Sequence, residues 1–302
     1  MLESWIPITI AAAFLQNLRS VLQKSLNGRV SMAGAAYARF FYAWPFSIVY
    51  VGLLHQVGGY TVPHVNGEFL LYVTMGGVAQ ILFTVVLLWM FTFRSFAVGT
   101  TFSKLEVIYI AGFGALLMGD YVGHFILLAI FIGSAGTIIL SLTETQISFA
   151  GLMRGMKEKA TLVGLFCAGL LGASVVCFRA AALSLNDPSF LMAAGFTLMI
   201  ALIFQTVFMG VWFLFFRPHE FKPLLIEWKK ASVVGIVGMV GSVCWFTAFT
   251  LQDAAYVRAL GQVELIFTFL AGLLIFREKM KLSELLAMAL IVISILMILL
   301  AA

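Results

Sequence analysis

Two glutamates are candidates for binding a proton or a substrate, because each lies near the middle of a long apolar run of the sequence. Glu106 and Glu264 are about ten residues from the nearer end of their runs, so neither short side chain could reach water if the runs cross a membrane. A charge at that depth costs at least about 2.5 kcal/mol and usually faces a protein interior or a cavity. A carboxyl group placed there can exchange a proton for a substrate ammonium group. We interpret both as substrate- or proton-binding residues, with buried, protonated hydrogen-bond donors as the alternative.

Four arginines also lie in apolar runs. Arg19 and Arg179 could each balance a glutamate or bind a substrate carboxylate through the planar guanidinium fork. A purely structural role for these two is an equal alternative. Arg39 and Arg258 lie about one or two helical turns inside their runs, so they can extend to the lipid headgroups. Arg39 is also kept as a candidate binding residue.

Aromatic residues form a weaker pattern. They could line a pocket for a flat or apolar solute, although helix packing and the membrane interface are the usual places for such residues. Tyr109, three residues after Glu106, is a candidate binding residue for this reason. The set is Tyr37, Tyr42, Trp44, Trp89, Phe91, Tyr109, Trp245 and Tyr256.

No catalytic pattern accompanies these residues. The four histidines fall in or beside expected loops, without metal-ligand spacing or a nearby nucleophile. The three cysteines lie in apolar runs, where we interpret them as small packing residues. We therefore expect neither an enzyme nor a bound metal or cofactor.

The apolar runs that carry these residues predict an all-α integral membrane protein. Hydrophobic residues make up 63% of the 302 positions, charged residues make up 10%, and the mean hydropathy is +1.08. A soluble domain has about a quarter of its residues charged. A membrane-spanning helix takes about 20 apolar residues. We predict ten transmembrane helices, at residues 5–26, 33–55, 69–93, 96–118, 121–141, 160–183, 188–216, 230–251, 254–276 and 282–301.

The ten runs form two sets of five. With an offset of 158 residues, 104–108 aligns with 262–266, which pairs Glu106 with Glu264. An offset of 160 pairs Arg19 with Arg179.

This pairing predicts two homologous five-helix repeats, 1–150 and 151–302. Because five is odd, the second repeat must enter the membrane upside down relative to the first. Many secondary transporters have this inverted architecture, with the binding site at the repeat interface near the midplane.

Glycines in the same runs predict close helix packing. Gly235, Gly238 and Gly241 recur every three residues in the eighth run, and Gly76-Gly77 lies in the third. Small residues at such spacing let helix backbones approach each other within a membrane.

In this arrangement the chain resembles the drug/metabolite transporter superfamily, specifically its EamA-type members. In that family the fourth span of each repeat ends in a leucine-rich run closed by Gly-Glu or a similar pair. The matching segments here are Ala115-Leu-Leu-Met-Gly-Asp120 and Leu273-Leu-Ile-Phe-Arg-Glu278, and the resemblance covers nearly the whole chain. Many members have a proline early in this span, where the present chain has Val107 and Leu265. A kink that depends on this proline is therefore not expected.

The resemblance implies export or exchange of amino acids, other metabolites or amphipathic compounds across a bacterial cytoplasmic membrane. The sequence has no nucleotide-binding loop, so we expect secondary transport by alternating access, with a proton as one possible coupling ion. The expected partners are a small-molecule substrate and membrane lipids, with no nucleic acid, and the expected state is a monomer. The alternative is a flippase or another protein that handles lipid or polyisoprenoid. An elongated cavity open to lipid would favour that alternative, and a closed polar chamber would favour a soluble solute.

Basic residues lie in alternate loops. The loops after spans 1, 3, 5, 7 and 9, together with the span ends beside them, hold thirteen of them, and the loops after spans 2, 4, 6 and 8 hold none. Positively charged short loops stay in the cytoplasm, so this bias places both termini outside. The resemblance implies the opposite orientation. We give the charges more weight, although splitting the long run 188–216 into two helices would reverse the assignment beyond it.

Overall fold

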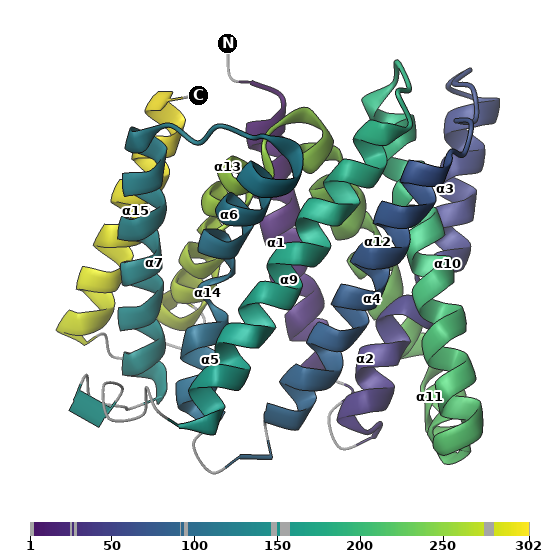
Figure 1. Cartoon of the computed structure of the whole chain (residues 1–302). Helices are drawn as coiled ribbons and strands as arrows, with labels where there is room; N and C mark the ends of the chain where they lie inside the picture. The colour runs from purple at the N-terminus through teal and green to yellow at the C-terminus, as the bar shows by residue number, and fades with distance from the viewer. Residues whose placement is uncertain are drawn as a thin grey trace. The chain divides into compact units, whose positions relative to one another are not determined.

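The structure is a computed structural model that describes residues 3–24, 26, 29–90, 92–93, 96–145, 150–151, 158–274 and 281–301. These residues fold into helices joined by short turns (Figure 1). The predicted all-α class is confirmed.

Most of the described residues lie in long apolar helices, and shorter helices occur beside breaks and in one connection. The helices are α1 (Trp5–Lys24), α2 (Met32–Phe41), α3 (Trp44–Gln56), α4 (Gly67–Met90), α5 (Phe96–Ser103), α6 (Glu106–Met118), α7 (His124–Thr145), α9 (Lys159–Ser184), α10 (Phe190–Phe216), η1 (Pro218–Glu220), α11 (Phe221–Ile226), α12 (Trp228–Leu251), α13 (Ala254–Leu260), α14 (Val263–Leu274) and α15 (Leu282–Ala301).

Eight helical segments in the described part of the chain are long and apolar enough to cross a membrane. The two predicted spans that do not qualify, 33–55 and 254–276, are each divided into two helices, α2/α3 and α13/α14. In the first, Pro45 lies in the first turn of α3. Proline lacks a backbone N–H, and its ring clashes with the carbonyl group four residues earlier, so it interrupts a continuous helix. The structure supports a multi-pass membrane protein and does not confirm ten spans.

Two breaks occur at nearly equivalent positions of the expected repeats. α5 ends at Ser103 and α6 begins at Glu106, while α13 ends at Leu260 and α14 begins at Val263. The 158-residue offset matches these positions to within one residue. Neither break requires the proline that many family members have.

The breaks change the setting of the two glutamates. Glu106 lies in the first turn of α6 and Glu264 in the first turn of α14, rather than in the middle of continuous helices. The N-terminal end of a helix carries partial positive charge and stabilises acidic side chains. The backbone therefore offsets part of the cost of each charge.

The long run at 188–216 forms one continuous helix, α10. The Ser189 side chain accepts a hydrogen bond from the Met192 amide and caps its N-terminus, as serine commonly does. A split of this run, which would have reversed the orientation inferred from charge, does not occur.

The chain divides into two compact units. Unit 1 comprises 82–176 and 253–302 together with Met1, and unit 2 comprises 2–81 and 177–252. Each unit draws helices from both of the expected sequence repeats. The repeats themselves, 1–150 and 151–302, stay a prediction.

Within unit 1, α7 packs closely along α15. A Cβ atom at Gly136 would lie 2.8 Å from the carbonyl oxygen of Ala287. The Ser294 hydroxyl donates a hydrogen bond to the Ala129 carbonyl oxygen at 2.7 Å. Small residues on both helices thus bring the two backbones together.

Within unit 2, α12 packs along α1 and also contacts α2. A Cβ atom at Gly235 would lie 2.6 Å from Tyr42, one at Gly238 would lie 3.0 Å from Arg19, and one at Gly241 would lie 3.2 Å from Leu15. The close packing predicted for these glycines is confirmed. Gly76 and Gly77 of α4 behave in the same way, against side chains of α9 and α10.

Candidate functional site

Unit 2 contains a cavity of about 40 Å³ bordered by five helices. One water molecule needs about 10–15 Å³ on this measure, so the cavity has room for roughly three. Its polar lining consists of Arg19 from α1, Arg39 from α2, Gln80 from α4, Gln205 from α10 and Ser242 from α12. The remaining lining residues are apolar: Phe40, Ala43, Leu198, Ala201, Leu202, Gly238 and Phe246.

Arg39 lies in the last turn of α2, where the helix C-terminus favours a cation. Its guanidinium carbon is 4.6 Å from the centre of the Phe40 ring, within cation–π distance. Arg39 and Arg19 are close enough for their charges to interact. In the part of the chain that the structure describes, no carboxylate lies within 4.0 Å of Arg39.

The side chain of Arg19 packs against Gly238 of the neighbouring helix α12. The position of a Cβ atom at Gly238 is 3.0 Å from Cδ of Arg19, so a larger residue would push against the aliphatic stem. Gly238 therefore leaves space for Arg19 to border the cavity.

Two glutamines complete the polar lining. Gln205 is 1% exposed, and its Nε2 donates to Oε1 of Gln80 at 2.5 Å. Each amide carries both donor and acceptor atoms. The sequence prediction missed both residues, although a large amide in the middle of an apolar run was a visible signal.

The glutamates belong to a different cluster, in unit 1. Arg258 of α13 donates through Nε and Nη2 to Oε1 of Glu106 on α6, and the Nε–Oε1 distance is 2.7 Å. The side chains of Arg258 and Glu106 are 18% and 13% exposed. Glu264 is close enough to Arg258 for their charges to interact.

These contacts correct one expectation and leave another untested. Arg258, which the sequence suggested could extend to the headgroups, instead pairs with Glu106 within the protein. Glu106 and Glu264, interpreted from the sequence as substrate- or proton-binding residues, are not among the residues that line the unit 2 cavity, whereas Arg19 and Arg39 are.

Arg179 and Tyr109 make packing and backbone contacts. Arg179 is buried, and its Nε donates to the Phe249 carbonyl oxygen at 3.0 Å, near the C-terminus of α12. The last carbonyl groups of a helix lack partners within it, so this bond satisfies one of them. Tyr109 packs against Gly172 of α9, and its ring centre is 5.9 Å from that of Phe113.

The described members of the predicted aromatic set are not among the residues that line the unit 2 cavity. Tyr37 and Tyr42 donate hydrogen bonds to backbone oxygens, and Trp245 donates to the side chain of Gln16. Phe91 lies outside the described residues. Phe40 and Phe246, which the sequence prediction did not include, are the aromatic residues of the cavity lining.

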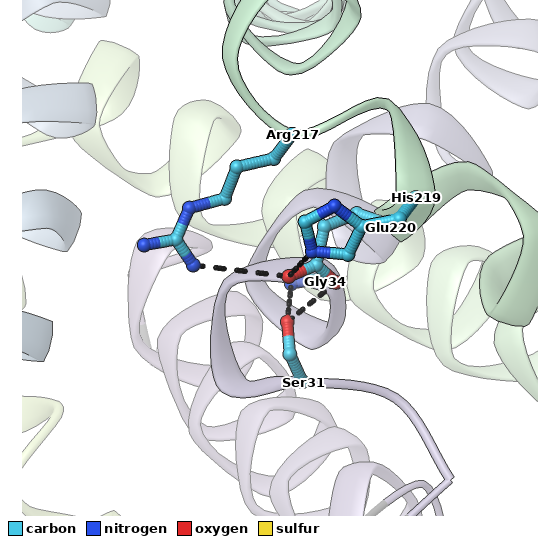
Figure 2. A network of polar contacts seen from close by, with 5 residues as sticks. All are labelled: Ser31, Gly34, Arg217, His219 and Glu220. Carbon is cyan, nitrogen blue, oxygen red and sulfur yellow. Dashed lines mark hydrogen bonds and ion pairs between the residues drawn. The ribbon is translucent and has the colours of Figure 1, made fainter.

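A second polar network joins α2 to the connection after α10 (Figure 2). Glu220 is 5% exposed and accepts a hydrogen bond from the Ser31 hydroxyl at 2.6 Å. The same hydroxyl accepts a bond from the Gly34 amide and caps α2. Arg217 and His219 approach the other carboxylate oxygen at 3.8 and 3.9 Å.

Comparison with known proteins agrees with the fold. A solved structure titled only "Crystal structure of protein" superposes with a TM-score of 0.76 at 16% sequence identity, covering 100% of both chains. At this identity the likeness shows the fold alone. No curated protein matches the chain by sequence.

The sequence itself carries the family relationship. Residues 158–300 match the EamA-like transporter family. This range includes the second leucine-rich segment expected from the resemblance, of which residues 275–278 lie outside the described part of the chain. This match, over slightly less than half of the chain, agrees with the resemblance to the EamA-type members of the drug/metabolite transporter superfamily.

Proposed function

We propose that the protein is a secondary transporter that moves a small organic solute across a bacterial cytoplasmic membrane by alternating access. The observation that carries this proposal is the unit 2 cavity, because α1, α4, α10 and α12 border it and each is apolar and long enough to span a membrane. Charged and amide side chains at such depth are costly and usually face a solute pathway. The match of residues 158–300 to a transporter family agrees with this function.

The sequence origin of the cavity walls supports alternating access. α1, α2 and α4 come from residues 1–150, whereas α10 and α12 come from residues 151–302. A site built from both expected repeats is typical of transporters with inverted repeats. The nearly equivalent breaks between α5 and α6 and between α13 and α14 also support the repeat.

The cluster of Glu106, Glu264 and Arg258 suits coupling to protons. It places two carboxyl groups and one guanidinium group at the breaks of the fourth spans. Protonation of one carboxyl would change the net charge of the cluster, which is a physical way to link proton binding to conformation. We propose Glu264 as the residue to test first, because Glu106 also holds Arg258 in place.

The lipid-handling alternative has less support. The cavity is small, and its arginine and glutamine side chains converge on one space. Such a lining suits the polar group of a compact solute better than a long acyl or isoprenoid chain.

Uptake into proteoliposomes tests the proposed function. We expect the purified protein to accelerate uptake of at least one member of an amino-acid and metabolite panel, and an imposed pH gradient to change the rate. In the Glu264→Gln variant this gradient effect should disappear. Protein-free liposomes are the control, and uptake at their rate for the whole panel would contradict the proposal.

Orientation remains a separate proposal. We propose that both termini face away from the cytoplasm, since thirteen basic residues lie in the loops and adjacent span ends on the opposite side. A reporter fused after Ala302 that is active only outside the cytoplasm should give a signal. A silent reporter, together with an active cytoplasmic one at the same position, would reverse the assignment.

A further inference from the structure

We infer that the unit 2 cavity binds the carboxylate of an organic anion, with Arg39 and Arg19 holding the charge and apolar side chains holding the rest of the molecule. Its place in transport rests on the proposed function, whereas anion binding can be measured on its own.

The charge of the lining points to an anion. Both arginines border the same small space, their charges interact, and none of the other lining residues is acidic. Like charges brought together in a low-dielectric setting repel each other, so an anion between them relieves the repulsion. A cationic or zwitterionic ammonium group would meet that repulsion instead.

The geometry of guanidinium favours a carboxylate. Its planar N–H groups match the two oxygens of a carboxylate in a bidentate arrangement. The cavity of about 40 Å³ has room for roughly three water-sized groups, about the size of the O–C–O unit, so the rest of a larger solute would have to displace the apolar side chains that border it.

The amide pair adds a neutral contact on the α4–α10 side. Gln205 is almost fully buried and already bonded to Gln80, so their positions are fixed before a solute arrives. Pre-positioned polar groups lower the ordering cost of binding.

The apolar lining indicates what lies beyond the carboxylate. Phe40, Phe246, Leu198 and Leu202 border the same space as the arginines. Such side chains solvate neither a second charge nor a sugar. The preferred solute is therefore a monocarboxylate with an apolar body.

Binding by the full-length protein in detergent tests this inference. The probes are acetate, butyrate and phenylacetate, each compared with its neutral amide and with inorganic phosphate, by calorimetry and thermal unfolding. We expect at least one carboxylate to bind roughly tenfold or more tightly than its amide, because a charged hydrogen bond is lost in the amide. Phosphate should bind more weakly than that carboxylate.

Variants locate the site. Arg39→Gln should abolish the preference for carboxylate over amide, and Arg39→Lys should keep part of it, because charge remains while the fork is lost. Arg29→Gln is the matched control, since it removes an exposed cation of the same unit that pairs with Glu227, away from the cavity. Each variant is first checked for cooperative unfolding.

The outcomes separate this inference from transport. Equal binding of carboxylates and amides, no binding of any carboxylate, tighter binding of phosphate, or an unchanged preference in folded Arg39→Gln would each overturn it. Carboxylate binding without uptake would contradict the transporter proposal alone. Uptake of amines, without carboxylate binding, would contradict this inference alone.

Discussion

Arg39 and Arg258 occupy the same kind of position, the last turn of a short helix that ends inside an apolar run. In unit 1, Arg258 donates two hydrogen bonds to Glu106. In unit 2, Arg39 faces a cavity that Arg19 also borders, and its closest described partner is the Phe40 ring. The two arginines thus differ in their surroundings: a carboxylate on a neighbouring helix compensates the charge of Arg258, whereas Arg39 borders a cavity together with a second arginine.

The largest expected difference concerns stability. Glu106→Gln leaves the Arg258 guanidinium partly buried without its carboxylate, so we expect a loss of up to about 3 kcal/mol in the free energy of unfolding. Denaturant unfolding in detergent measures it. Glu227→Gln, which breaks the more exposed pair with Arg29, should cost less than about 1 kcal/mol. Equal losses in the two variants would mean that the Arg258 pair contributes no more than a surface pair.

The double variant Glu106→Gln/Arg258→Gln sharpens this result. Removing both side chains avoids a cation without its hydrogen-bonded carboxylate, while Glu264 loses its cationic neighbour, so only part of the lost stability should return. A purely additive loss would contradict direct coupling between the two side chains.

Arg39→Gln should affect transport more than stability, in contrast to Glu106→Gln. Because Arg39 has a like charge beside it and no described carboxylate within 4.0 Å, we expect stability to change by less than about 1 kcal/mol. Uptake of the solute should nevertheless fall by about tenfold or more. Both are measured on the same purified protein, and a loss of stability as large as that of Glu106→Gln would remove the contrast between the two arginines.

The smallest expected effect comes from the glycine that seats Arg19. Gly238→Ala places a methyl group about 3.0 Å from a flexible part of Arg19, so the side chain shifts at little cost in stability. We expect a several-fold rise in the KM of uptake, equivalent to about 1 kcal/mol.

Gly241→Ala is the matched control on the same helix. Its methyl group would meet Cβ of Leu15 at 3.2 Å, a stiffer contact, and the three nearest atoms belong to Leu15 and Gln16. It should reduce stability more than Gly238→Ala and leave the KM nearly unchanged. The reverse order would show that Gly238 acts through helix packing alone.

The sequence predicted the long helices well and the breaks poorly. Hydropathy identified α4, α7, α9, α10, α12 and α15 because it averages over a whole run. It is insensitive to a local change in backbone angles such as the one at Leu105, where ψ is 10°. Pro45 was the one residue that could have indicated the break between α2 and α3.

For the site, the sequence identified charged residues but not their partners. Arg19 and Arg39 were both candidates, yet their convergence on one cavity depends on the packing of α1 and α2 against α12. The pairing of Glu106 with Arg258 joins residues 152 positions apart, which no local pattern encodes. Gln80 and Gln205 could have been predicted, because an amide side chain inside an apolar run, like a charged one, usually faces a protein interior or a cavity.

Both ends of α2 are fastened to the connection that follows α10. Ser31 at its start bonds to Glu220, and Tyr42 directly after its end bonds to the Leu224 carbonyl oxygen in α11 at 3.1 Å. Helix α2 and the connection are thus held together at two points. Arg39 lies on α2, and the exposed His219 lies on the connection. A bulky label or a crosslink on the connection at His219 would therefore restrain α2, one wall of the cavity, without contacting the cavity itself.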